Sequence, residues 1–354
     1  MFTPNPGTHT IAEILSEPQT WRKCLAELDA SGQLKRLSSD LQRNVEWIFV
    51  GCGSSFYLAQ AAAASWSLTT NDPARAVPAS ELLLFPGTLP QAAQYVLISR
   101  SGHTSEVIQV ATQLKGSGVA PVLAITCGSE TPLEKLATVT IMLHPADEKS
   151  TVMTRSFTSM LLSLQALAAE RAGNRSLAEA LRTLPAEAEA ILQPAQKTIR
   201  SLVNSRSFAD YVFLGQGPFF AAAQESMLKV KEMSCSYAQC FHTLEFRHGP
   251  KAIVSAETLL TFFLSESGCE EEAAVLHEMK ELGAITLVVA NSITSEVRKS
   301  ADYAVELGLA VPETARVAAS VIPGQLLGFF TGVRKGFDPD SPRNLSRVVM
   351  LEGK

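Results

Sequence analysis

Apolar residues recur along this chain in short unbroken runs, each followed by a polar turn and a longer amphipathic segment. In the first half such runs lie at residues 47–50, 95–98, 122–125 and 139–143. Short apolar runs bounded by turns are typical of strands buried on both faces, as in a parallel sheet that helices cover. The pattern therefore predicts an α/β fold with doubly wound parallel sheets.

Helical periodicity fills the segments around these runs. Residues 16–29 place Trp21, Leu25 and Leu28 on one face, which predicts an amphipathic helix in a helical lead-in that covers residues 1–42. A stretch rich in alanine, leucine and glutamate at residues 157–202 predicts a long helical segment that ends the first domain and leads into the second.

The chain repeats itself with a period of roughly 165 residues. Residues 45–63 and 209–227 both have a strand, a glycine turn and a helix, and residues 95–126 and 259–290 share a strand, a Ser-x-Ser-Gly turn, a helix, a glycine break and a strand. We expect two tandem domains from an internal duplication, at residues 43–195 and 196–354, the second ending in a tail at residues 336–354.

The two halves differ where the strands end. The first half has Ser99, Arg100, Ser101, Gly102, His103 and Thr104 at the turn, together with Ser54 and Ser55 after its first strand. The second half has Glu270, Glu271 and Glu272 in the corresponding place. Hydroxyl and backbone N–H donors at a helix N-terminus suit a phosphate, whereas three carboxylates repel one. The pattern predicts that the first domain binds phosphate at the carboxyl ends of its strands.

Other interpretations of these turns remain open. Serine and threonine before a helix are common N-caps, and Arg100 is either a positive charge for the anion or a surface residue. A dinucleotide site is disfavoured because Phe56 stands where the third glycine of Gly-x-Gly-x-x-Gly is needed, and no Gly-Lys-Ser/Thr loop is present.

The densest chemistry lies at residues 225–250, which we expect to begin as a helix after the Gly215 turn. Glu225, Lys229 and Glu232 share one face of that helix, which is either a solvated charged face or a functional one. Acids, bases and cations then follow within seven residues at His242, Glu245, Arg247 and His248. Glutamate and histidine together can move protons on carbon and on a ring oxygen.

Composition narrows the class of protein. The 354 residues carry a net charge of −5, which argues against nucleic acid as a partner. Six scattered cysteines indicate free thiols in a reducing cytosol. The N-terminus lacks a signal-peptide pattern, and we expect no apolar run of the ~20 residues that span a bilayer. No metal or cofactor is implied.

Five motifs, in order and spacing, resemble the sugar isomerase (SIS) family. They are GCGSS, SRSGHTSE, LKVKE, EFRHGPKAIV and PRNLSRVV, and the resemblance covers about residues 45–350. The most similar groups are the isomerase part of glucosamine-6-phosphate synthase, the amino-sugar-phosphate deaminase/isomerases and the fructosamine-6-phosphate deglycases. The resemblance implies two tandem flavodoxin-like SIS domains that act on a sugar 6-phosphate in the cytoplasm.

The resemblance also implies a role for individual residues. Glu232 moves the proton between C1 and C2, Lys229 lies near the sugar hydroxyls, and His248 opens the ring from the partner subunit of a homodimer. The phosphate-binding residues are Ser54, Ser55, Ser99, Arg100, Ser101 and Thr104. The sugar-lining residues are Cys52, Gly53, Thr151, Met153, Thr154 and Arg347.

Two departures from the synthase leave the reaction open. The chain begins Met-Phe-Thr, without the N-terminal cysteine of a glutaminase domain, and Arg347 replaces a lysine that can form a Schiff base. Isomerisation or deamination of an amino-sugar 6-phosphate is the favoured reaction. Deglycation of a fructosamine 6-phosphate, a glutaminase-less synthase-like isomerase and a non-catalytic phosphosugar-binding regulator are the alternatives.

Overall fold

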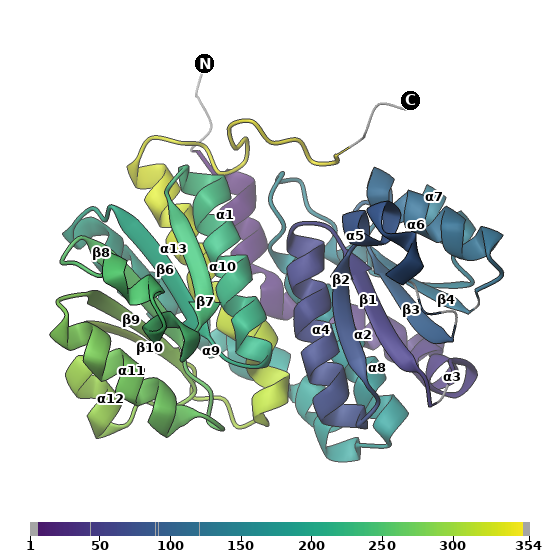
Figure 1. The fold of residues 1–354 in the computed structure, drawn as a ribbon, viewed down its shortest axis with the longest axis horizontal. Coiled ribbons are helices and arrows are strands. Elements are labelled where there is room, and N and C mark those ends of the chain that lie inside the picture. The colour runs from purple at the N-terminus through teal and green to yellow at the C-terminus, as the bar shows by residue number, and fades with distance from the viewer. Residues whose placement is uncertain (1–5, 43, 89, 91, 120, 350–354) are drawn as a thin grey trace. The chain divides into compact units, whose positions relative to one another are not determined.

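The computed structural model describes residues 6–349 except residues 43, 89, 91 and 120. It contains two five-stranded sheets in which every pair of neighbouring strands is parallel (Figure 1). The first sheet is formed by β1 (Glu46–Gly51), β2 (Ala74–Pro78), β3 (Ala93–Ile98), β4 (Val122–Thr126) and β5 (Val139–Met142). The second is formed by β6 (Asp210–Gly215), β7 (Ala238–His242), β8 (Thr258–Phe263), β9 (Ile285–Ala290) and β10 (Tyr303–Glu306).

Both sheets have the same strand order. The first runs β2-β1-β3-β4-β5 and the second β7-β6-β8-β9-β10, which is the flavodoxin-like order when strands are counted from the first of each sheet. In both sheets the first strand thus lies between the second and the third. The predicted duplication and parallel α/β fold are confirmed.

The chain divides into two compact units, one around each sheet. The first unit comprises Gln19–Glu148, Met153–Arg182 and Ser346–Lys354, and the second comprises Met1–Pro18, Lys149–Val152 and Thr183–Leu345. The units differ from the domains expected from sequence, because a few short segments belong to the other unit by spatial contact. The expected domains follow the sequence repeat instead. The boundaries of those sequence domains stay a prediction.

The helices fall into three groups along the chain: the lead-in before β1, the helices of the first unit and the helices of the second unit. The lead-in forms α1 (Thr8–Leu15), α2 (Glu17–Ser31) and α3 (Gln33–Asp40). In the first unit α4 (Ser54–Thr70), α5 (Ala79–Leu84), α6 (Ser105–Gly116), α7 (Pro132–Leu136) and α8 (Arg155–Ala172) follow, and α9 (Arg175–Ser205) leads into the second. The second unit continues with α10 (Pro218–Ser234), α11 (Cys269–Glu281), α12 (Ser295–Ser300) and α13 (Val317–Arg334).

Two expectations for the helices need correction. The stretch at residues 157–202 is two helices, because Gly173 ends α8 in a left-handed conformation. Residues Glu313–Arg334 are long and apolar enough to cross a bilayer, contrary to expectation, but 94% of that window is buried, as in a core helix. The predicted face of the lead-in helix is confirmed, since Trp21, Leu25 and Leu28 of α2 are buried.

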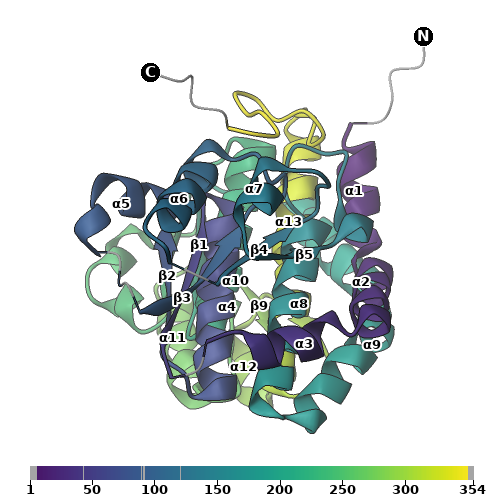
Figure 2. The same cartoon turned by 90° about the vertical axis from the view of Figure 1, so that its right-hand side faces the viewer.

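The three central strands of the first sheet, β1, β3 and β4, bury side chains on both faces. Ile48 and Val50 of β1 lie in a core with α6 residues such as Val107. The alternate residue Trp47 faces the other way, and its ring centroid lies 3.9 Å from that of Trp66 in α4. Figure 2 shows these helices of the first unit. Burial on both faces explains why the strands read as continuous apolar runs.

Three glycines bring α13 against α10 in the second unit. A Cβ atom built at Gly324 would lie 1.9 Å from Ser226 Oγ, and one at Gly332 would lie 2.3 Å from the Met233 carbonyl oxygen. The glycine between them, Gly328, would meet the Lys229 carbonyl oxygen at 2.7 Å. The spacing of four residues puts all three on one face, so the two helix backbones approach closely along their length.

Gly328→Ala should destabilise the protein by about 1–3 kcal/mol, because the new methyl group meets backbone that cannot move without separating the helices. Urea unfolding measures the loss. The control is Gly116→Ala at the end of α6, where an added Cβ has no neighbour within 4 Å. It should be neutral or slightly stabilising. Equal effects of the two variants would contradict the helix contact.

Candidate active site

The loop between β3 and α6 holds hydroxyl groups in a compact turn. Ser99 Oγ accepts a hydrogen bond from the Gly102 N–H at 3.1 Å and lies 2.9 Å from Thr104 Oγ1. Ser101 Oγ accepts one from the His103 N–H at 3.1 Å. Gly102 has φ +68°, and a Cβ there would lie 2.5 Å from Thr131, so this position requires glycine. We call residues 99–104 the first loop.

Thr104 does not serve as a helix cap. It precedes α6, yet its side chain accepts no capping hydrogen bond. Thr131 and Thr294 do act as caps, accepting from the N–H groups of Glu134 and Val297. The capping interpretation of Thr104 is therefore wrong. The positive end of the α6 dipole remains directed at the first loop.

The turn between β1 and α4 has the same backbone conformation as the equivalent turn between β6 and α10. Gly53 has φ 54° and ψ −127°, and Gly217 has φ 51° and ψ −130°, conformations that favour glycine. Ser54 and Ser55 then begin α4 and are buried. Burial raises the pKa of the Cys52 thiol to about 11, so this side chain stays protonated at neutral pH.

Two of the predicted sugar-lining residues meet other groups of the first unit. Met153 Sδ lies 3.8 Å from Ser55 Oγ, which joins two predicted site residues. Thr154 is buried and donates its hydroxyl hydrogen bond to Glu148 Oε1 at 2.8 Å. In the second unit the Thr151 hydroxyl donates to the Asp340 carbonyl oxygen at 3.4 Å.

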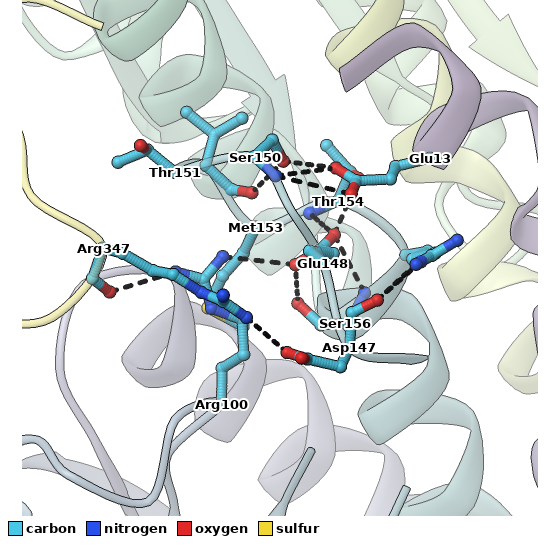
Figure 3. Close-up of polar contacts among 12 residues, drawn as sticks. Glu13, Arg100, Asp147, Glu148, Ser150, Thr151, Met153, Thr154, Ser156 and Arg347 are labelled. Carbon is cyan, nitrogen blue, oxygen red and sulfur yellow. Dashed lines mark hydrogen bonds and ion pairs between the residues drawn. The ribbon is translucent and has the colours of Figure 1, made fainter. Parts of the chain in front are cut away.

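Glu148 is a buried carboxylate that the sequence patterns did not single out. It accepts hydrogen bonds from the backbone N–H groups of Thr154 and Ser156 and from both hydroxyls (Figure 3). It also lies 3.3 Å from the Arg100 guanidinium, which is buried as well. Arg100 is therefore not a surface residue. Its charge is turned toward Glu148, and its role toward phosphate stays a prediction.

Arg347 and its neighbours lie beside the first loop. The Arg347 carbonyl oxygen accepts a hydrogen bond from Arg100 Nη2 at 3.0 Å, and its guanidinium pairs with Asp147 at 2.5 Å (Figure 3). The Ser105 N–H at the start of α6 contacts the Val349 carbonyl oxygen at 3.5 Å. The Arg347 guanidinium therefore already pairs with a partly exposed carboxylate of the same unit.

The charged face of α10 is buried rather than solvated. Glu225 and Lys229 are fully buried, with Lys229 Nζ 3.1 Å from Glu225 Oε1 and 2.5 Å from Glu232 Oε2. Glu232 keeps 18% of its side chain exposed. Burial by itself lowers the pKa of Lys229, but the two carboxylates outweigh it, so this pKa lies above its ordinary value. Sequence reasoning placed Glu225 on this face but did not count it as a site residue.

The turn that carries His248 is anchored on both sides. Phe246 is fully buried in the core of the second unit, and Arg247 and Lys251 both pair with Glu278 of α11, at 2.7 and 2.6 Å. His248 itself is exposed. Among the described residues, no hydrogen bond or ion pair joins it to Glu232 or Lys229. The structure thus fixes its backbone and leaves the imidazole accessible.

The fold and the site define a duplicated flavodoxin-like α/β protein with a hydroxyl-lined loop after β3 and a buried cluster of charged residues on α10. The family model described as "SIS domain" matches residues 41–170 and 210–327. The chain belongs to the SIS domain family, and the predicted resemblance is confirmed.

Relatives narrow the class further. A glutamine–fructose-6-phosphate aminotransferase (isomerizing) of Pyrobaculum aerophilum is 28% identical, and the match covers 97% of this chain and 57% of that protein. Glucosamine-6-phosphate deaminase from Thermotoga maritima is 28% identical, with a TM-score of 0.82 over 97% of this chain and 99% of that one. A tagatose-6-phosphate ketose/aldose isomerase from Escherichia coli, 23% identical with a TM-score of 0.82 over 94% of this chain and 95% of that one, shares the fold.

This chain thus spans little more than half the length of the curated aminotransferases that it matches. It is a SIS protein similar to phosphosugar isomerases and deaminases.

Replacing Glu148 by alanine should cost about 3–5 kcal/mol of unfolding free energy, because it leaves the Arg100 guanidinium buried without this partner. The neighbouring Asp147→Ala is the control. Its ion pair with Arg347 is about half exposed, so the loss should stay below about 1 kcal/mol. Chemical unfolding of both variants measures the difference. Similar losses would show that Glu148 does not organise this segment.

Proposed function

We propose that this chain is an enzyme that opens a sugar 6-phosphate, with an amino-sugar 6-phosphate favoured, and transfers a proton between C1 and C2. The observation that carries the proposal is the cluster on α10. Two of its three charged groups are fully buried, and Glu232 alone of the three remains partly exposed. Burying a lysine and a glutamate is costly unless they are paired, so a solvated face would not need this arrangement.

Each residue then has a chemical role. Lys229 holds the Glu232 carboxylate at 2.5 Å, in place to accept a proton from carbon. Glu225 holds Lys229 from the other side, so it acts as a positioning residue. In this proposal the donors of the first loop, with Ser54 and Ser55, bind the phosphate. The sugar is lined by Cys52, Gly53, Thr151, Met153, Thr154 and Arg347. The N-terminus of α6, where the Thr104 side chain makes no capping hydrogen bond, supports the phosphate role.

The reaction balances for a 2-amino aldose. After ring opening, Glu232 takes the C2 proton to form an enolamine, and returning a proton to C1 leaves an imine at C2. Water adds to C2 and ammonia leaves, which gives the ketose phosphate. Isomerisation of a plain sugar phosphate stops after the proton transfer. Arg347 stays protonated and cannot form the Schiff base that a lysine could, and this disfavours a synthase-like reaction.

Glu232→Gln should lower kcat at least about a hundredfold and leave the dissociation constant of the sugar phosphate within a few fold, because only the proton acceptor is lost. A panel of glucosamine 6-phosphate, fructosamine 6-phosphates, and fructose 6-phosphate with ammonium, followed by mass spectrometry, identifies the substrate. Calorimetric titration of the variant measures binding. The exposed Lys231→Gln on the same helix is the control and should keep full activity.

A complementary variant separates binding from chemistry. Thr104→Val should raise KM about tenfold or more with little change in kcat, since it removes a hydroxyl donor to the phosphate. The control variant Thr294→Val, at a helix cap, should change neither KM nor kcat.

Full activity of Glu232→Gln would refute the proposed base. Tight binding without conversion of any substrate by the native protein would favour the regulator instead.

We also propose that the enzyme works in the cytoplasm as a homodimer, in which His248 opens the ring bound to the partner subunit. The exposure of His248 on an anchored turn supports this role, because the imidazole is fixed and accessible. The cysteines are free, which agrees with a reducing compartment.

Mixing two inactive variants tests the dimer. In a heterodimer of Glu232→Gln and His248→Asn, one of the two sites has an intact glutamate and an intact partner histidine. Random exchange makes half of the dimers hybrid, so activity should return to about a quarter of the native value. Activity is measured after co-refolding of the two chains. If no activity returns although hybrids form, His248 does not act across the interface.

A further inference from the structure

The second unit carries a counterpart of the first loop, at residues 265–272 after β8. Ser265 Oγ accepts a hydrogen bond from the Gly268 N–H at 2.9 Å, just as Ser99 Oγ accepts one from Gly102 at 3.1 Å. We call residues 265–272 the second loop. Its hydroxyl and N–H donors therefore survive the duplication, although the sequence alone suggested that three glutamates had replaced them.

These donors are occupied by a carboxylate of the same chain. Glu313, in the short helix η5 (Glu313–Arg316), accepts hydrogen bonds from the backbone N–H groups of Glu266 and Ser267, the second at 3.4 Å, and from Ser267 Oγ at 2.5 Å. Two successive backbone N–H groups and a hydroxyl on one oxyanion are the contacts that an external anion makes at such a loop.

The second loop itself ends in a buried carboxylate, Glu272. Glu272 is fully buried, and its Oε2 accepts from the Ser265 N–H at 2.7 Å and from Ser265 Oγ at 3.1 Å. Its Oε1 has no hydrogen-bond partner among the described residues. Burial raises the pKa of Glu272 to about 7. Glu270 and Glu271 are exposed, so the three glutamates do not act together.

Among the described residues, no carboxylate accepts a hydrogen bond from the serine and threonine hydroxyls of the first loop. Glu106 stands at the position that corresponds to Glu272, yet within the described chain it accepts no hydrogen bond from Ser99, whose hydroxyl contacts Thr104 and Gly102 instead. Its buried Oε2 has no partner in the described part of the chain. In the described part of the chain the two loops thus share a fold and differ in whether a carboxylate accepts hydrogen bonds from their hydroxyls.

Arg316 connects the short helix of Glu313 to the second loop. Its guanidinium holds the Glu266 carboxylate through two contacts, at 2.5 and 3.1 Å, and its Nε donates to the Val311 carbonyl oxygen at 2.6 Å. Arg316 and Glu266 therefore connect η5 to the second loop next to the hydrogen bonds of Glu313. The same short helix leads directly into α13, whose glycines contact α10.

We propose that the second loop is a complete oxyanion site whose permanent ligand is the Glu313 carboxylate, and that it accepts a small external oxyanion once Glu313 is removed. The internal carboxylate has two consequences. It keeps solution anions out of the second loop, and it fastens the short helix before α13 to this loop through contacts that an anion in solution could not maintain.

Chemical rescue tests the proposal. Glu313→Ala should melt several degrees lower than the native protein, because three donors lose their acceptor. Formate, which supplies the missing carboxylate, should raise the melting temperature of the variant at least about 2 °C more than it raises that of the native protein, with chloride at equal ionic strength as the reference. Inorganic phosphate should act in the same way. If the variant does not stay folded, its refolding yield in formate against chloride is the readout.

Two further variants make the test specific. Glu296→Ala removes a carboxylate that pairs with Lys299 on the surface, and it should show no formate-specific gain. Glu313→Ala with Ser267→Ala lacks one of the donors and should lose most of the rescue. A gain shared by all variants, or none in Glu313→Ala, would overturn the proposal. Comparison with the native protein cancels anion binding at the first loop, so the result does not depend on the proposed enzyme function.

Discussion

The close contact between α10 and α13 is the constraint on which the second unit depends. Gly324, Gly328 and Gly332 leave no room for a side chain between the helices, so the backbone of α10 is placed by the backbone of α13. Lys229 contributes both its carbonyl oxygen to this contact and its ammonium group to the acid–base cluster. The geometry of the proposed chemistry is thus fixed by helix packing rather than by a flexible loop.

Electrostatics inside the protein follow from that packing. A lysine enclosed at this depth stays charged only because carboxylates flank it on both sides, and the pairing outweighs the cost of burial. In the first unit the same rule applies to Arg100 and Glu148, which share a buried environment with the hydroxyls of Thr154 and Ser156. Each unit therefore contains a buried cation that a carboxylate of the same unit pairs with.

Duplication gave both units the same strand order and the same turns, and their later differences concern anions. Within the described residues the hydroxyls of the first loop have no carboxylate partner, whereas Ser267 of the second loop donates to Glu313. A helix N-terminus after a parallel strand attracts negative charge wherever the fold places it. One unit leaves that property available to a ligand, and the other uses it to hold its own structure together.

The sequence by itself determined the strands that form apolar runs, the repeat, the glycine turns and the shared face of Glu225, Lys229 and Glu232, because these depend on periodicity and on local backbone requirements. It did not predict β2, β7 or β10. Only the tertiary structure decided that this face is buried, that Arg100 meets Glu148, and that Glu313 occupies the second loop. The partners in the last two pairs lie 48 and 46 residues apart in the chain, so no local pattern connects them. Side chains become buried and charges become paired only when the helices pack on each sheet. This packing decides which polar side chains remain accessible to a substrate.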